Sequence, residues 1–184
     1  IFDRNLKDQE LNRLEHVSQQ KHKQYQQIRQ LLDNLLYWAL GQLGAYSTQV
    51  ETFDLSQLGE EVIQIYKGPA DEKGYELAID IQTKLEITGD RTGLGEVLHN
   101  LVGKAMKFTE GGKITISAQP SDTHTLIEVV DTGVGMNDQQ LSKLFQDTQN
   151  QSTKGTCGEK GTGLGRQIVK QMVDSWTGEG YGIC

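Results

Sequence analysis

Cysteine and proline are scarce in this 184-residue chain. The two cysteines, Cys157 and Cys184, stand apart and form no CxxC pair, which argues against a disulfide framework and a sulfur-based metal site. The only prolines, Pro69 and Pro120, are expected in connections between elements. This cysteine usage indicates a reducing compartment.

Long apolar runs and an excess of positive charge are also lacking. No stretch approaches membrane-spanning length, and the charged first ten residues do not resemble a signal peptide. We therefore expect a cytoplasmic location, with membrane attachment only through regions outside this chain. The 18 basic against 25 acidic residues give a formal charge of -7, so we expect no nucleic-acid partner.

The first part of the chain predicts one long helix over residues 9–46. Its apolar residues recur at alternating steps of three and four, as in a coiled-coil seam: Tyr25, Ile28, Leu32, Leu35 and Ala39. A single helix cannot bury such a seam, so we expect it to pair with a second copy of the chain. The boundary with the next domain is expected near residue 50.

The remainder mixes strand and helix patterns. Strands are expected at residues 75–81, 113–119 and 124–131, and helices at 56–67, 89–108, 137–145 and 163–175. Either Asp54 or Ser56 is a suitable N-cap for the first of these helices. The order predicts an α+β fold, a two-layer sandwich with helices on one face of a mixed sheet.

One motif is "VVDTGVGM" at residues 129–136, where a strand ends on Asp131. A carboxylate there can accept a hydrogen bond from an exocyclic amine, and Gly133 and Gly135 let the backbone approach a flat ring. The alternative is a tight turn capped by Asp131, and the motif taken alone favours this turn.

A second motif lies on the expected helix at residues 89–108. Glu96, Asn100 and Lys104 follow one another at intervals of four residues, with Lys107 alongside. Such a polar stripe can meet phosphates and a metal ion. An ordinary solvated helix face explains it equally simply and is preferred on this pattern alone.

The third motif is glycine-rich, with five glycines within residues 155–165. A helix begins directly after "GTGLG" at residues 161–165, so its free N–H groups form a general anion site. Lys154 and Lys160 add positive charge to this segment. The alternative is a flexible solvent loop.

In this order and spacing, the motifs resemble the ATP-binding catalytic domain of sensor histidine kinases, in the GHKL ATPase superfamily. The boxes that match are "HNLVGKAMKFT" (N box, 99–109), "DTGVGM" (G1, 131–136), "KLF" (F, 143–145) and "GTGLG" (G2, 161–165). The resemblance implies a Bergerat-type ATP-binding domain over residues 51–184. It also implies that residues 1–50 hold part of a dimerisation hairpin, namely its second helix.

The resemblance also implies roles for individual residues. Asp131 would receive the adenine amine, with Gly133 and Gly135 shaping the base pocket. Asn100, a Mg²⁺ ligand, and Lys107 would act at the phosphates as catalytic residues. The family's ATP lid would supply further nucleotide contacts from Lys160, Gly161, Thr162, Gly163, Leu164 and Gly165.

The implied function is transfer of the γ-phosphoryl group of ATP to a histidine on the hairpin, in two-component signalling. The implied partners are a second copy of the chain, through the N-terminal helix, and a response regulator. His16 and His22 lack the family's acidic and proline neighbours, so we expect the phosphoacceptor to lie outside this chain.

The chain departs from the family's N box at Lys104, where a second asparagine normally ligates Mg²⁺. An ammonium group has no lone pair for a cation and repels it. Lys104 can instead touch phosphate oxygens directly and is counted among the nucleotide-binding residues. Three outcomes stay open: weakened metal-dependent catalysis, metal-independent nucleotide binding, and a pseudokinase module without phosphotransfer.

Overall fold

The structure is a computed structural model that describes residues 48–142 and 165–176, together with ten positions between residues 13 and 39. Each of these ten positions is helical. Four of the apolar seam residues among them are exposed: Tyr25, Ile28, Leu32 and Leu35. Helical structure at these positions agrees with the helix predicted for this part of the chain.

The strands form two separate sheets. The larger one has the order β2-β4-β5, with β2 parallel and β5 antiparallel to the central β4. The smaller one is an antiparallel pair of β1 and β3. The strand bounds are β1 Val50–Asp54, β2 Glu76–Asp80, β3 Glu86–Asp90, β4 Lys113–Pro120 and β5 Thr125–Asp131.

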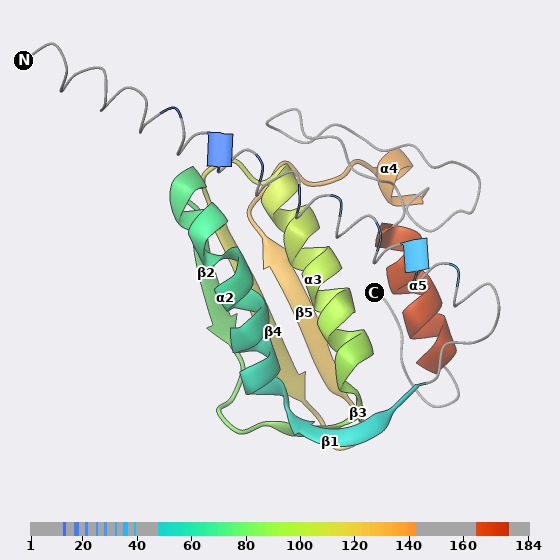
Figure 1. Cartoon of the computed structure of the whole chain (residues 1–184). Coiled ribbons are helices and arrows are strands. Elements are labelled where there is room, and N and C mark those ends of the chain that lie inside the picture. Colours follow the sequence, from blue (N-terminus) through green and yellow to red (C-terminus); the bar gives the residue numbers. More distant parts are fainter. Residues whose placement is uncertain are drawn as a thin grey trace, which may run out of the picture.

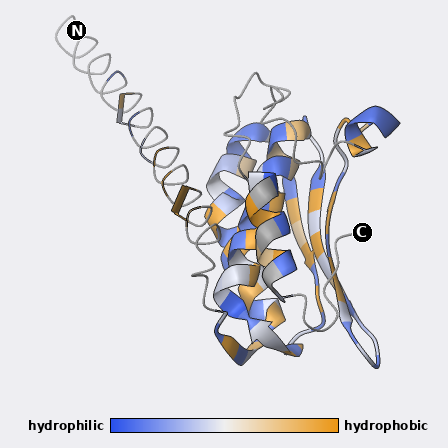
Figure 2. Cartoon of the chain, turned by 90° about the vertical axis from the view of Figure 1, so that its right-hand side faces the viewer, coloured by the Kyte–Doolittle hydropathy of each residue, from blue (hydrophilic) through white to orange (hydrophobic). Residues whose placement is uncertain are grey.

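The three long helices gather on one face of the three-stranded sheet, and Figure 2 shows the two layers edge-on, with the one short helix apart from the others. In Figure 1, α2 and α3 lie in front of the sheet, roughly along its strands, and α5 lies beside α3. The helix bounds are α2 Leu55–Lys73, α3 Arg91–Phe108, α4 Asp138–Ser142 and α5 Gly165–Trp176. This arrangement confirms the predicted α+β sandwich with a mixed sheet.

The core fills the space between these layers. Leu55 and Val62 of α2, Leu98 of α3, and Ile114 and Ile116 of β4 are almost fully buried. Burying each such side chain stabilises the fold by roughly 1.5–3 kcal/mol. A second cluster joins α3 to α5 and consists of Val97, Ile168, Val169 and Met172, with Leu101 and Trp176 partly buried around it.

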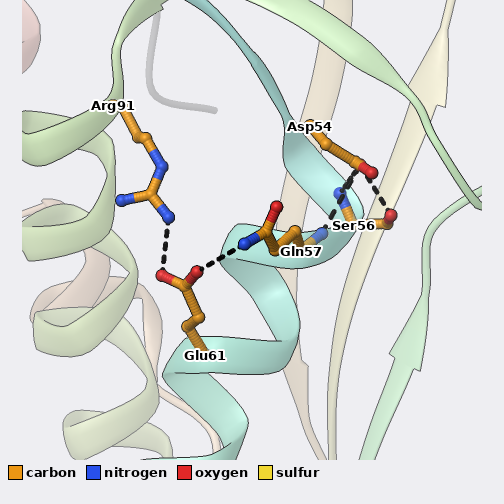
Figure 3. Close-up of polar contacts among 5 residues, drawn as sticks. All are labelled: Asp54, Ser56, Gln57, Glu61 and Arg91. Carbon is orange, nitrogen blue, oxygen red and sulfur yellow. Dashed lines mark hydrogen bonds and ion pairs between the residues drawn. The ribbon is translucent and has the colours of Figure 1, made fainter.

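Strands β1 and β3, which the sequence did not reveal, deliver the N-caps of the two long helices. Asp54 ends β1 and caps α2, and its Oδ1 accepts hydrogen bonds from Ser56 N at 2.8 Å and Ser56 Oγ at 2.6 Å (Figure 3). The Ser56 hydroxyl is the main cause that lowers the pKa of Asp54. Asp90 ends β3, and its Oδ1 accepts from Gly93 N at 3.0 Å at the start of α3. Of the two N-cap candidates for α2 that the sequence offered, Asp54 and Ser56, the structure shows Asp54 as the cap.

An ion pair ties the first turns of α2 and α3 together. Arg91 Nη2 lies 2.6 Å from Glu61 Oε2, and Gln57 Nε2 donates to Glu61 Oε1 at 3.1 Å (Figure 3). These side chains are partly exposed, so the pair adds at most about 1 kcal/mol. Its effect is to fix the α2–α3 register at the end of the molecule where both helices begin.

The expectation that Pro69 lies in a connection was wrong, because Pro69 is inside α2. The helix continues past it to Lys73 and ends at Gly74, whose φ of 72° is left-handed. Ala70 is 1% exposed, and its carbonyl accepts a hydrogen bond from Tyr75 N at 2.9 Å. The burial of Ala70 in this last turn therefore outweighs the helix-breaking tendency of proline.

Candidate functional site

Asp131 lies at the end of β5, and the sheet register determines the direction of its side chain. It shares a face of the strand with Ile127 and Val129, which pack against the core beneath the helices. Its Oδ1 accepts hydrogen bonds from Gly133 N at 2.8 Å and, at a long 3.5 Å, from Thr109 Oγ1. Asp131 is exposed, and no hydrogen bond to its Oδ2 is recorded from the part of the chain that the structure describes. One carboxylate oxygen is therefore held in place while the other remains accessible.

Thr109 anchors this corner to the core. It is fully buried and caps the C-terminus of α3, where its N–H donates to Ala105 O at 3.0 Å. Its carbonyl accepts a hydrogen bond from Tyr75 Oη at 2.9 Å. The group that contacts Asp131 is thus fixed by bonds to α3 and to the segment after α2.

The two glycines after Asp131 let the chain pass tightly over the end of α3. A Cβ at Gly133 would overlap the Phe108 carbonyl oxygen and lie 2.7 Å from Asp131 Oδ1. Val134 N donates to that same Phe108 oxygen at 3.1 Å, and Gly135 has a φ of 65°. The segment is therefore a tight turn held by Asp131, as the simpler interpretation predicted. That turn also keeps space beside the carboxylate free of side-chain atoms.

A second part of the site lies where α3 meets the N-terminus of α5. Asn100 Nδ2 donates to Glu96 O at 3.0 Å, one turn earlier in α3, so its Oδ1 is directed away from that carbonyl. A Cβ at Gly165 would stand 2.5 Å from Asn100 Oδ1 and 3.8 Å from Lys104 Cε. The structure thus brings Asn100 and Lys104 together against the first residue of α5.

Lys104 stands in a positively charged environment. Burial is the main cause that lowers its pKa to about 8, followed by the positive charges of Arg166 and Lys107. The Lys107 ammonium also lies 5.0 Å from the centre of the Phe108 ring. Lys104, Lys107 and Arg166, hereafter the basic cluster, converge from α3 and α5. Together with the N–H groups that open α5, they favour an anion.

Sequence reasoning missed two residues of this region. Thr109 is the last residue of the N-box match, but its contact with Asp131 depends on the packing of α3 against β5. Arg166 follows the last glycine of the G2 match, and its position at the start of a helix was the available signal.

Several predicted residues lie outside the described part of the chain. They are Lys160, Gly161, Thr162, Gly163 and Leu164, and the F box at residues 143–145. Among residues 48–142 and 165–176, Asp131, Gly133 and Gly135 form one group, and Asn100, Lys104 and Gly165 form another. Lys107 joins the second group through its charge.

The described residues hold no cluster of three or more His, Cys, Asp or Glu side chains suited to a metal ion. Near the start of α5, the structure places the side-chain oxygen Asn100 Oδ1 next to Lys104. No helix within the described ranges is long and apolar enough to cross a membrane.

The chain belongs to the family described as histidine kinase-, DNA gyrase B- and HSP90-like ATPases, which it matches over residues 89–181, half of its length. The G1 and G2 segments and all of α3 lie inside this match. ATP binding is the activity that defines such a domain.

Three relatives place the chain more closely within that family. It is 30% identical over 155 residues to the autoinducer 2 sensor kinase/phosphatase LuxQ of Vibrio cholerae, covering 81% of this chain and 18% of LuxQ. Full-length ShkA, solved in complex with AMPPNP, is 26% identical with a TM-score of 0.65, over 79% of this chain and 30% of ShkA. The catalytic domain of histidine kinase ThkA is 26% identical with a TM-score of 0.60, over 69% of this chain and 81% of that domain.

These likenesses confirm the resemblance found in the sequence. The fold is the Bergerat-type ATP-binding fold, and the chain is an ATP-binding catalytic domain of the sensor histidine kinase type. It spans less than a fifth of the length of LuxQ.

Proposed function

We propose that this chain binds ATP between Asp131 and the start of α5, and that the protein containing it transfers the γ-phosphoryl group to a histidine. The observation that carries the proposal is the Asp131 carboxylate, whose Oδ1 is held by Gly133 N at 2.8 Å. The likeness to ShkA, whose structure contains the ATP analogue AMPPNP, supports the choice of nucleotide.

The adenine ring binds beside the turn after β5. The Oδ2 atom of Asp131 accepts a hydrogen bond from the exocyclic amine, and Gly133 and Gly135 leave room for the flat ring. Hydrogen bonds to a charged acceptor contribute about 1.5–3 kcal/mol, enough to decide between nucleobases. A base with a carbonyl in place of the amine would place two acceptors against each other.

The triphosphate extends toward α3 and α5. Lys107, Lys104 and the first N–H groups of α5 face it, and Gly165 keeps this path free of a side chain. The segment Lys160–Leu164, which precedes α5 in the sequence, contributes further phosphate contacts in this proposal. Phosphoryl transfer depends mainly on such positioning and charge neutralisation.

In the transfer, a nitrogen of the acceptor histidine forms a bond to the γ-phosphorus while the bond from that phosphorus to the bridging oxygen of ADP breaks. ADP leaves with the electron pair of the broken bond, and the histidine loses its proton to solvent. The acceptor histidine lies outside this chain. The exposed seam at Tyr25, Ile28, Leu32 and Leu35 supports dimerisation through the N-terminal helix. A response regulator would receive the phosphoryl group.

Mg²⁺ normally neutralises and bridges the phosphate oxygens in such transfers. In this chain, Asn100 Oδ1 is a candidate ligand, but Lys104 lies next to it, and the charges of Arg166 and Lys107 act on Lys104. Mg²⁺ prefers several oxygen ligands, and a nearby ammonium group repels it. The described residues therefore do not fit a protein-held Mg²⁺ site, and we derive no step through the metal.

The proposal is tested by calorimetric titration of ATP into the 184-residue chain and its Asp131→Asn variant. In the variant the amide oxygen keeps the hydrogen bond from Gly133 N, so the N–H₂ group faces the adenine amine, donor against donor. The variant should therefore lose roughly tenfold or more in affinity. Asp80→Asn is the matched control, because Asp80 is also an exposed aspartate at the end of a strand. Unchanged affinity in Asp131→Asn would remove Asp131 from the adenine site.

A further inference from the structure

We propose that the Lys104 ammonium group takes the place of a metal ion at the triphosphate, so that this chain binds ATP without Mg²⁺. The inference rests on the proposed ATP site and concerns how that site holds the phosphates. At a site whose residues fit Mg²⁺ poorly, the Lys104 ammonium group neutralises part of the nucleotide's charge.

The position of Lys104 is the first observation. Lys104 follows Asn100 by one helical turn of α3, and both face the start of α5, because a Cβ at Gly165 would lie near both side chains. The family's second N-box asparagine occupies this same position. In this proposal the Lys104 ammonium group meets the phosphate oxygens that the start of α5 also faces.

The second observation is the charge around Lys104. Arg166 from α5 and Lys107 from α3 both add positive charge at Lys104. Glu96, the acidic residue of this stripe, lies two turns earlier in α3 and acts on Tyr66 of α2. The structure records no ion pair between Lys104 and another described residue. A polyanion bound here would therefore meet the positive charge of Lys104 together with those of Arg166 and Lys107.

The chemistry differs from that of a bound metal. An ammonium group carries one charge and three N–H donors, so it can hydrogen-bond phosphate oxygens directly. It cannot bridge two phosphates with the fixed octahedral geometry of Mg²⁺. Replacing Mg²⁺ by the Lys104 ammonium group therefore preserves nucleotide binding. The γ-phosphoryl group is then no longer oriented by a metal ion.

The test is titration of ATP into the 184-residue chain, once with excess Mg²⁺ and once with a chelator that removes divalent ions. The wild-type dissociation constant should differ by less than about threefold between the two conditions or be lower in chelator. Lys104→Asn should bind at least tenfold more weakly in chelator and regain affinity when Mg²⁺ is added. Lys104→Arg keeps the charge and should retain binding in chelator.

Lys67→Asn, an exposed lysine substitution on α2, controls for the loss of one positive charge. A circular-dichroism melt of each variant shows whether the substitution preserves the fold. If wild-type binding falls tenfold or more in chelator, Lys104 does not replace the metal, while the ATP site stands. If Lys104→Asn binds as well as wild type in chelator, the inference is also overturned. If the wild-type chain binds ATP in neither condition, the proposed function itself fails, and this inference fails with it.

Discussion

Gly165 at the start of α5 lies against the Asn100 side chain of α3, so closely that a Cβ at residue 165 would stand 2.5 Å from Asn100 Oδ1. Asn100 is itself held by its hydrogen bond to Glu96 O at 3.0 Å. The close approach of these two residues brings the N–H groups of α5 to the polar stripe of α3. It joins the one described residue of the G2 match, Gly165, to the N-box match.

Gly165→Ala should therefore damage nucleotide binding more than folding. The new methyl group displaces the Asn100 amide, whose side chain can move at a cost of about 1 kcal/mol for the lost hydrogen bond. We expect a several-fold loss of ATP affinity in calorimetry, with only a small fall in melting temperature. Gly68→Ala is the control, since a Cβ there meets nothing within 4 Å and alanine favours the helix. Wild-type affinity in Gly165→Ala would show that this contact does not shape the phosphate site.

Gly133→Ala should act on the fold itself. Its Cβ would overlap the Phe108 carbonyl oxygen, a backbone atom that already accepts a hydrogen bond from Val134 N. Relief requires a backbone shift, and we expect a loss of roughly 1–3 kcal/mol in unfolding free energy. Chemical denaturation measures it.

Gly135→Ala provides the comparison for that substitution. Its φ of 65° is left-handed, but a Cβ there meets nothing within 4 Å. Its cost should be only the roughly 1–2 kcal/mol of a left-handed alanine. The tight turn after Asp131 would be contradicted if Gly133→Ala had the same stability and the same ATP affinity as wild type.

Lys104→Met should stabilise the nucleotide-free chain. The substitution removes a partly buried charge that Arg166 and Lys107 repel, while keeping a side chain of similar length. We expect a gain of roughly 1–3 kcal/mol in unfolding free energy without nucleotide, and a much smaller stabilisation by added ATP than in wild type. Thermal melts with and without ATP report both effects. A less stable Lys104→Met chain would mean that Lys104 is held by favourable contacts instead.

Alkaline stability should depend on Tyr66. Burial, with a smaller effect from Glu96, raises the pKa of Tyr66 to about 12, and its Oη donates to His99 O at 2.9 Å. The unfolded chain releases the phenolic proton near pH 10, whereas the folded chain holds it, so stability falls as pH rises from about 10 to about 12.

Denaturant unfolding at pH 8 and pH 11 checks this expectation. Tyr66→Phe should be about 1 kcal/mol less stable than wild type at pH 8, because it lacks the hydrogen bond. It should lose less stability than wild type between the two pH values. If both proteins lost the same stability between these pH values, Tyr66 would not be the cause of the alkaline loss of stability.

Periodicity predicted the elements that carry a long apolar face. Helix α3 was recognisable because Val97, Leu98 and Val102 recur on one side, and these residues are buried. Strands β1 and β3 are five residues each and pair mainly with one another, so neither carries a recognisable pattern. Proline at residue 69 suggested a break that the burial of Ala70 prevents.

The site was predictable to the extent that its residues stand at fixed spacing. Asn100 and Lys104 are one turn apart on a helix, and Asp131 directly precedes a glycine turn. The contributions of Thr109 and Arg166 depend on how α3 packs against β5 and α5. No local pattern contains that information, because those contacts join residues far apart in the sequence.

The most direct test of the central claim compares ATP with inosine triphosphate in calorimetric titrations of the 184-residue chain. The two ligands share the ribose and triphosphate, but inosine carries a carbonyl where adenine carries its amine. An accessible carboxylate oxygen at Asp131 predicts saturable ATP binding and an affinity for inosine triphosphate lower by roughly 10- to 100-fold. Equal affinities would show that the phosphates alone are recognised, and absence of ATP binding would contradict the nucleotide site itself.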